Sequence, residues 1–319
     1  MNAEIFAEWL KRQGHQIYRT ASSYWYNAGP KVLQAFPYHW LISPEKDEIH
    51  TLMLKHGIVA LRYSSPSDSL TGKLSYHFVL QKCYDLNTLN NKARNGVKRG
   101  LNCFKVVQVS FERLAKEGWI LQQDTLLRQN RSGSMNQKEW EQLCLSAQSL
   151  PGFEAFAAVS GDEMAAAVIV CRIDNIFSVP YAISHCRFLR NHVNNALFFS
   201  FCCDLLKRNN VNGIFFNVQS LDAPSNVDEF KLRMGFEPKI IRQNVVIHPF
   251  IKPFISSSIH ALSRRLLQRY PSNHQIAKAE GMMRFYLEGK RPIEEQTWPE
   301  CLKVHKMSIN VDNVKETSK

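Results

Sequence analysis

The second half of the chain alternates short apolar runs with turn signals, a pattern typical of antiparallel strands. Apolar residues dominate 154–160, 163–173 and 176–184, and a Gly-Asp pair and an Asp-Asn pair separate the three runs. Such two-residue turns connect hairpin strands because Gly, Asp and Asn tolerate positive φ. We therefore predict a three-stranded antiparallel meander.

After the meander, helical and strand patterns alternate. Phe198, Phe201 and Leu205 have the spacing of one helix face. The predicted elements that follow the meander are a loop over 185–195, helix 195–209, strand 213–219, helix 226–234 and a last strand within 239–249. Crossover helices between later strands predict a mixed, mostly antiparallel sheet flanked by helices, that is, an α/β (α+β) fold.

The first half is less regular, and a Leu-Pro-Gly boundary over 150–152 ends it. We predict helices over 46–55, 85–101, 111–130 and 136–149, and strands over 57–64, 75–81 and 104–110. Helix 85–101 would be capped by Asp85, with an apolar line of Leu89, Ala93, Val97 and Leu101. Two basic helices, 254–269 and 273–289, precede a disordered tail. The expected units are 1–150, 151–250 and 251–319.

Composition narrows the class of partner. The chain has 319 residues, 45% of them apolar, and a formal net charge of +12, which favours an anionic partner such as nucleic acid, a phosphorylated cofactor or a membrane surface. No apolar run reaches the length of a membrane span, and the first residues do not resemble a signal peptide. The eight cysteines form no CxxC pair, so we expect reduced, mostly buried thiols in a cytoplasmic protein.

Several enzyme classes lack their motifs. The sequence contains no GxxxxGK[ST], no GxGxxG after a strand, no HExxH and no GxSxG. The eleven histidines are scattered singly, so we expect no metal site. We also expect no tightly bound cofactor.

Basic residues gather in two places. The first is the segment 91–105, which has no acidic residue and is extended by two later arginines; the basic residues are Lys92, Arg94, Lys98, Arg99, Lys105, Arg128 and Arg131. The basic side chains of such a segment either form a solvated helix face or bind a long anion such as a nucleic acid. The second is the start of helix 195–209, beside Arg187 and Arg190, where free backbone N–H groups suit a phosphate. The alternative there is an asparagine-capped core helix.

Helix 226–234 carries one lysine beside its apolar stripe. Asn226 suits the N-cap, Gly235 ends the helix, and Lys231 lies about 70° from the centre of the stripe by the 3.6-residue period. Lys231 is therefore either a snorkelling surface lysine or a cation directed into a cleft.

The second half resembles the GNAT fold of N-acyltransferases over about 150–250. The resemblance rests on the helix-to-strand sequence Met-Gly-Phe-Glu-Pro and on the register Asn191-x-x-Asn194-x-Ala196, where acetyl-CoA enzymes carry [QR]xxGx[GA]. The missing glycines put CoA binding in doubt. The pair Phe230-Lys231 before Gly-Phe resembles the FemABX branch, which transfers amino acids from aminoacyl-tRNA to peptidoglycan precursors. The resemblance implies a degenerate GNAT-like unit in the first half as well, and a basic helical extension outside the fold.

The resemblance implies a set of donor contacts. Lys231 would steady negative charge on the donor, and the donor would lie against Phe230, Arg187, Arg190, Asn194, Asn195 and Ala196. The expected function is transfer of an acyl or aminoacyl group from an anionic donor, acyl-CoA or aminoacyl-tRNA, to an amine acceptor. That acceptor would be a peptidoglycan precursor or a small amine.

The sequence gives fewer indications of the catalytic residues and of contact with a membrane. Tyr181 and Ser184 are the candidate proton-transfer residues, on the strand expected beside the cleft. The alternative function is a non-catalytic protein on a decayed GNAT scaffold that binds RNA or a membrane surface. The basic C-terminal helices are the segment expected to contact a membrane.

Overall fold

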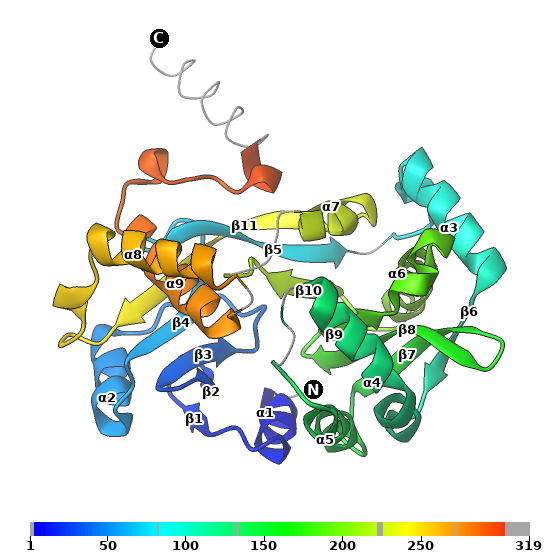
Figure 1. The fold of residues 1–319 in the computed structure, drawn as a ribbon, viewed down its shortest axis with the longest axis horizontal. Coiled ribbons are helices and arrows are strands. Elements are labelled where there is room, and N and C mark those ends of the chain that lie inside the picture. Colours follow the sequence, from blue (N-terminus) through cyan, green and yellow to red (C-terminus); the bar gives the residue numbers. More distant parts are fainter. Residues whose placement is uncertain are drawn as a thin grey trace, which may run out of the picture.

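The chain folds around one 11-stranded sheet covered by helices on both faces (Figure 1). The computed structural model describes residues 3–81, 83–129, 131, 134–221, 226–271 and 273–303, without the side chains of 226 and 227. The helices are α1 (Ala3–Arg12), α2 (Lys46–His56), α3 (Asn91–Cys103), α4 (Phe111–Arg128), α5 (Gln137–Ala147), α6 (Val193–Leu206), α7 (Asn226–Arg233), α8 (Ser257–Arg269) and α9 (His274–Glu288). The strands are β1 (Ile17–Arg19), β2 (Tyr24–Gly29), β3 (Val32–Phe36), β4 (Ala60–Ser65), β5 (Lys73–Gln81), β6 (Lys105–Val109), β7 (Phe153–Ser160), β8 (Glu163–Ile173), β9 (Ile176–Ser184), β10 (Gly213–Val218) and β11 (Glu237–Ile247).

The sheet contains the same strand arrangement twice. Its order is β1-β2-β3-β4-β11-β5-β10-β9-β8-β7-β6. In each half an antiparallel series leads through a helix to a parallel strand: β3 reaches β4 through α2, and β9 reaches β10 through α6. The strands that follow are exchanged, since β5 pairs with β10 and β11 pairs with β4. This exchange joins the halves into one sheet.

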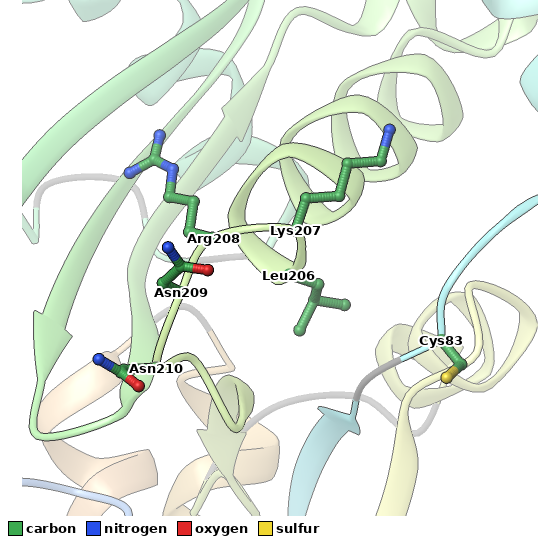
Figure 2. Close-up of a pocket in the computed structure, with 6 residues that line it drawn as sticks. All are labelled: Cys83, Leu206, Lys207, Arg208, Asn209 and Asn210. Carbon is green, nitrogen blue, oxygen red and sulfur yellow. The ribbon is translucent and has the colours of Figure 1, made fainter.

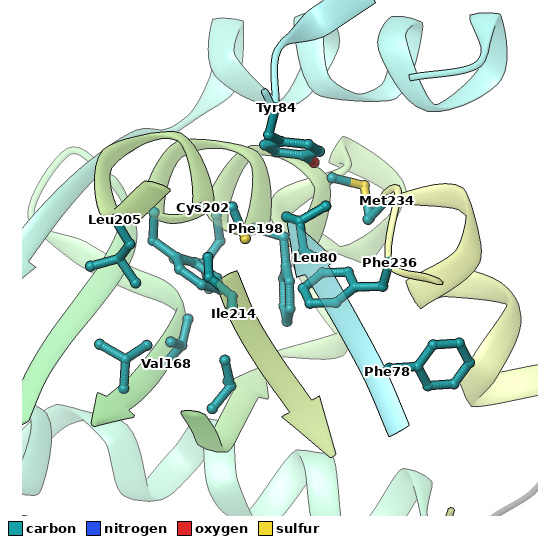
Figure 3. Packing of buried hydrophobic residues seen from close by; sticks show 14 of the residues in the cluster. Phe78, Leu80, Tyr84, Val168, Phe198, Cys202, Leu205, Ile214, Met234 and Phe236 are labelled. Carbon is teal, nitrogen blue, oxygen red and sulfur yellow. The ribbon is translucent and has the colours of Figure 1, made fainter. Parts of the chain in front are cut away.

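Two apolar layers cover the second half. On one face α6 packs Phe198, Cys202 and Leu205 against Val168 of β8 and Ile214 of β10 (Figure 3). The exchanged strand β5 and the end of α7 complete this cluster. On the other face α1, α4 and α5 pack against β7, β8 and β9. The second half therefore has a closed hydrophobic core on both faces of its sheet.

The predicted mixed sheet is confirmed. The meander is β7-β8-β9, and the bounds of β8 and β9 are those predicted. The α6, β10, α7 and β11 order also follows the prediction within a few residues. The predicted loop over 185–195 is instead a 3-10 helix, η2 (Cys186–Asn191), followed by the start of α6.

The predicted helix over 85–101 is wrong at both ends. Asp85 caps a short 3-10 helix, η1 (Leu86–Thr88), and α3 begins after a second cap, in which Asn90 accepts a hydrogen bond from the Ala93 amide. Leu101 is 40% exposed, because α3 packs against α6 through Gly96 and Gly100 instead. The strands and helix within 3–36 were not predicted.

The C-terminal helices differ from each other in burial. The described part of α9 packs on the sheet through Phe285, which is fully buried, whereas α8 has no buried residue. Within the described ranges no helix is long and apolar enough to cross a membrane. The tail predicted to be disordered lies outside the described residues.

Candidate active site

A cleft opens where the parallel strands β9 and β10 separate. Their pairing covers Gly213 to Phe215 with Ile176 to Ser178 and then ends. Pro180 follows two residues later on β9, and proline has no N–H to donate to a neighbouring strand. On β10 a bulge between Phe215 and Asn217 shifts its register against β5. The two strands therefore diverge, and the edge of β9 beyond Ser178 faces a cavity.

This cavity, called the splay cavity below, has a volume of about 510 Å³. It is bounded by the end of α4, by β9, α6 and β10, and by α7. Seven residues predicted from the sequence line it: Arg128, Arg131, Tyr181, Ser184, Asn194, Phe230 and Lys231. The structure thus brings both catalytic candidates and three cations to one place.

Lys231 does not lie at a rim, as the helical wheel predicted, but is buried. Its side chain is 2% exposed, and its Nζ atom lies 4.9 Å from the ring centre of Phe78 and 5.1 Å from that of Phe216. Phe78 belongs to β5, the strand contributed by the first half. The exchanged strand therefore covers a helix position that would otherwise face solvent.

A carboxylate holds the buried ammonium group. Lys231 Nζ donates to Asp228 Oδ1 at 3.0 Å, and the other oxygen of Asp228 accepts a hydrogen bond from the Tyr76 hydroxyl. Burial lowers the pKa of Lys231, and the Asp228 carboxylate partly offsets this. Cys301 lies close to this group, and burial together with Asp228 raises the pKa of its thiol to about 12. The Cys301 thiol thus stays protonated near neutral pH.

Phe230 precedes Lys231 and forms part of the apolar wall. Its ring meets that of Phe198 of α6 edge-on, with centroids 5.2 Å apart. Both rings line the splay cavity. The stripe predicted for α7 is therefore in place at Phe230 and Met234, while the side chains of Asn226 and Val227 lie outside those described.

Arg128 is fixed against the end of β9. Its Nη2 atom donates to the Ser184 carbonyl at 2.6 Å and to the Ser184 hydroxyl at 3.1 Å, and its Nε donates to Asp124 at 2.9 Å. Thr125 accepts a hydrogen bond from the Ser184 amide and donates to the Ser184 carbonyl. Ser184 is therefore a buried residue on which α4 is anchored, and its hydroxyl oxygen accepts a hydrogen bond from the Arg128 guanidinium.

Tyr181 stands between two cavities. A second cavity of about 470 Å³ shares Pro180 and Tyr181 with the splay cavity and continues toward α1, β2 and α5. Its lining combines aromatic rings with Glu139 and Lys278. Burial raises the pKa of the Tyr181 phenol, so this group stays protonated at neutral pH and can donate a proton but cannot act as a base.

Several polar residues of the splay cavity were not predicted, among them Asn217 and Ser220. Asn217 lies at the β10 bulge, and its Oδ1 atom is buried without a hydrogen-bond partner among the described residues. Ser220 follows on the same segment and accepts a hydrogen bond from Arg131 at 3.4 Å. No local sequence signal marks either residue, because the bulge that places them depends on pairing with β5.

Four predicted donor contacts lie away from the splay cavity. Arg187 is exposed and paired with Glu163, and Arg190 is exposed on η2. Asn195 and Ala196 lie under α3, whose Gly100 would place a Cβ atom 2.6 Å from the His192 carbonyl oxygen. At the start of α6, where a CoA pyrophosphate would be expected, Asn195 and Ala196 therefore lie against another helix, while Asn194 of the same turn lines the splay cavity.

The basic helix α3 exposes most of its predicted cations. Lys92, Lys98 and Arg99 are exposed, and Lys105 is exposed on β6. Arg94 differs, since its guanidinium donates to the carbonyls of Leu86 and Leu89 and so holds η1 onto α3. Arg128 and Arg131, grouped with α3 by sequence, belong to the splay cavity instead.

A larger open hollow lies at the other end of α6 (Figure 2). It is lined by Cys83 and the segment 206–210 and shares no residue with the splay cavity. Arg208 there is neutralised by Glu154 and Asp204. Lys207, which is exposed, is the other cation of this hollow.

Metal-binding and thiol chemistry have weak support in the described residues. Asp124, His185 and Cys186 come within metal-binding distance of one another, but Asp124 already accepts hydrogen bonds from Arg128 and from the Cys186 amide. Cys202, half of the adjacent pair, is fully buried, which raises its pKa. Three cysteines are exposed (Cys83, Cys103 and Cys186), so the thiols are less buried than predicted.

Comparison with known proteins identifies the fold. No family model and no curated protein matches the sequence. Among solved structures, FemX matches 78% of this chain and 92% of its own with a TM-score of 0.53 at 9% identity. The C-terminal domain of a protein described as a lysylphosphatidylglycerol synthetase from Agrobacterium fabrum matches 76% and 86%, with a TM-score of 0.51 at 8% identity. A conserved protein of unknown function from Bacteroides thetaiotaomicron VPI-5482 matches 77% and 91%, with a TM-score of 0.54 at 10% identity. The chain therefore shares its fold with FemX and with this synthetase domain, as the resemblance seen in the sequence implied.

Proposed function

We propose that this protein transfers an aminoacyl group from aminoacyl-tRNA to an amine acceptor. The observation that carries the proposal is the splay cavity, in which Lys231, Arg128 and Arg131 line one space beside the unpaired edge of β9. Attack of an amine on the donor carbonyl creates an oxyanion, which fixed cations and N–H donors stabilise. The cavity provides such cations, and Tyr181, which lines it, also lines the second cavity with Tyr26 and Tyr38.

The two joined cavities provide separate places for donor and acceptor. We place the donor carbonyl in the splay cavity, beside the cations, and the acceptor in the second cavity beyond Tyr181. In the transfer step the amine nitrogen bonds to the carbonyl carbon and loses a proton, the bond to the tRNA ribose oxygen breaks, and that oxygen takes up a proton. We assign this proton transfer to Tyr181, which lines both cavities; its phenol gives a proton to the ribose oxygen and regains one from the amine.

A tRNA donor is preferred to acyl-CoA for two reasons. Helix α3 packs closely on the start of α6 at His192 and Ala196, which leaves less room there for a pyrophosphate. The exposed cations of α3 and β6 suit a long polyanion, and the sequence has no acidic residue between Asp85 and Glu112. As the acceptor we propose a peptidoglycan precursor or a small amine.

The test is filter binding of tRNA over a range of salt, followed by a transfer assay with a labelled aminoacyl-tRNA pool and mixed amine acceptors. Counterion release should make tRNA retention fall steeply with salt, and the Lys98→Glu/Arg99→Glu variant should bind more weakly. The matched control is Lys46→Glu/Lys55→Glu, which reverses the charge of two exposed lysines on α2.

Three outcomes would count against the proposal. Absence of tRNA retention at low salt, with no effect of the α3 reversals, would remove the tRNA donor. Transfer from acetyl-CoA under mass-spectrometric assay would favour the CoA alternative. Tight RNA binding without transfer from any donor would favour the non-catalytic alternative.

A further inference from the structure

Helix α8 exposes a narrow aliphatic stripe. Ile259, Leu262 and Leu266 are 44%, 52% and 43% exposed, and their spacing places them within about 60° of one another around the helix axis. A neighbouring face of α8 lies on α9, where His260 and Glu280 are 2.8 Å apart. The stripe therefore belongs to a helix that is anchored on one side and uncovered on another.

Cations border this stripe on the side away from α9. By the same helical period, Arg265 and Arg269 lie next to Leu262, and both are exposed. The sequence contains no acidic residue between Glu237 and Glu280. The surface is thus apolar and cationic, with no anion of its own in that segment.

The segment just before α8 has a similar composition. Phe250 and Phe254 are 79% and 71% exposed, and the exposed Lys252 lies between them in sequence. Exposed apolar side chains that gather in a patch rimmed by polar residues mark protein or membrane interaction sites. Together with α8, this segment provides aromatic, aliphatic and basic side chains, the composition of interfacial helices that lie in the plane of a bilayer surface.

We propose that α8 and residues 250–254 dock on an anionic lipid bilayer. The aliphatic stripe would enter the boundary between headgroups and acyl chains, while Arg265, Arg269 and Lys252 contact lipid phosphates. Contact with nucleic acid would leave the stripe in water, because aliphatic side chains do not stack on bases. A symmetric contact with a second copy would bring the same arginines together.

The proposed docking surface involves fewer helices than the membrane contact expected from the sequence. That expectation included both C-terminal helices, but α9 uses its apolar face on the sheet. The proposal concerns α8 and does not depend on transferase activity, so an inactive protein would still bind lipid.

The test is sedimentation of the full chain with vesicles of phosphatidylcholine alone and with vesicles in which phosphatidylglycerol replaces a third of it. We expect binding to the anionic vesicles only. Leu262→Gln/Leu266→Gln should reduce the partition coefficient at least about tenfold. Arg265→Gln/Arg269→Gln should reduce it about fivefold for each arginine.

The control is Leu127→Gln/Leu145→Gln, which changes two leucines that are 57% and 44% exposed on α4 and α5. It should bind vesicles like the unmodified protein, and thermal melts should show that all variants fold. Equal binding by the α8 variants, or no sedimentation with anionic vesicles at low salt, would overturn the proposal. A dimer that depends on α8 would also overturn it. So would a protein that does not bind vesicles but binds RNA, if Leu262→Gln/Leu266→Gln abolishes the RNA binding.

Discussion

The Lys231 ammonium lies 3.0 Å from Oδ1 of Asp228, three residues earlier on α7, while the other carboxylate oxygen accepts from Tyr76 of β5. A side chain of the first half thus completes an ion pair of the second. The pair orients the cation to which the sequence resemblance assigned the negative charge of the donor, and its burial makes Lys231 both a structural and a candidate catalytic residue.

Lys231→Met should destabilise the fold. Removing one partner of a buried pair usually costs about 3–5 kcal/mol, and we expect about 2–3 because Asp228 is partly exposed and keeps Tyr76. The double variant Lys231→Met/Asp228→Asn should recover much of this free energy of unfolding, which denaturant titration can measure. An effect of Lys231→Met below about 0.5 kcal/mol, the size typical of surface substitutions, would mean that the lysine is solvated.

The catalytic contribution of Lys231 is separable from its structural one. Once a donor is identified, Lys231→Met should lower turnover by about 10²-fold under conditions where the variant is folded, the scale for losing one charge-stabilising group. Phe230→Ala, which removes apolar wall next to it, should lower stability more than turnover. Full turnover in folded Lys231→Met protein would remove the lysine from the mechanism.

Tyr181→Phe tests the proton donor with little disturbance of packing. The ring lies between Trp9 and Trp140, with centroids 6.3 and 6.2 Å away, and phenylalanine keeps these contacts. Turnover should fall about 10²-fold, within the usual range for general acid–base groups, while the melting temperature changes little. Unchanged turnover would assign the proton transfer elsewhere, to water or to the substrate.

The α3–α6 contact requires glycine at one position more than at another. Gly100→Ala would place a Cβ atom 2.6 Å from the backbone oxygen of His192, whereas Gly96→Ala meets the Asn195 side chain at 3.1 Å. We expect Gly100→Ala to cost about 1–3 kcal/mol through overpacking. Gly96→Ala should be near neutral, because Asn195 can move and alanine favours the helix. Thermal denaturation of both variants compares the two; equal stability would mean that α3 does not pack this closely.

Acid should destabilise the protein through two buried histidines. Burial lowers the pKa of His39 to about 4 and that of His77 to about 3, from 6.5. The unfolded chain therefore takes up protons first, so stability is full above pH 6.5 and falls as the pH drops toward these values. At pH 5 the loss is up to about 2 kcal/mol for each histidine, over 1.5 pH units.

Melting curves from pH 7 to 5 measure this slope. The variant His39→Gln/His77→Gln should flatten it, whereas His50→Gln, at an exposed position of α2, should leave it unchanged. If the double variant keeps the full slope, other groups carry the acid sensitivity.

Local pattern was sufficient for much of the second half. The two-residue turns delimit β8 and β9 at their observed ends, because turn residues and alternating burial are both short-range properties. The stop of α7 at Gly235 is equally local: this glycine has a φ of 85°, which other residues adopt at a cost. The strands β1 to β3 could not be predicted in this way. They are short and lie at or near one end of the sheet, so their sequences contain too few residues to show the pattern.

Which residues meet was decided by pairing between distant segments. By sequence alone Lys231 is a rim lysine and Arg128 belongs with α3, since a helical wheel describes only one helix. The insertion of β5 beside β10 and β11 buries Lys231 between Phe78 and Phe216, and the docking of α4 on Ser184 brings Arg128 into the same cavity. The sequence by itself therefore determined the elements, their ends and the candidate residues. Only the tertiary structure decided which of them share a site, because strand exchange and helix docking depend on contacts that no local period encodes.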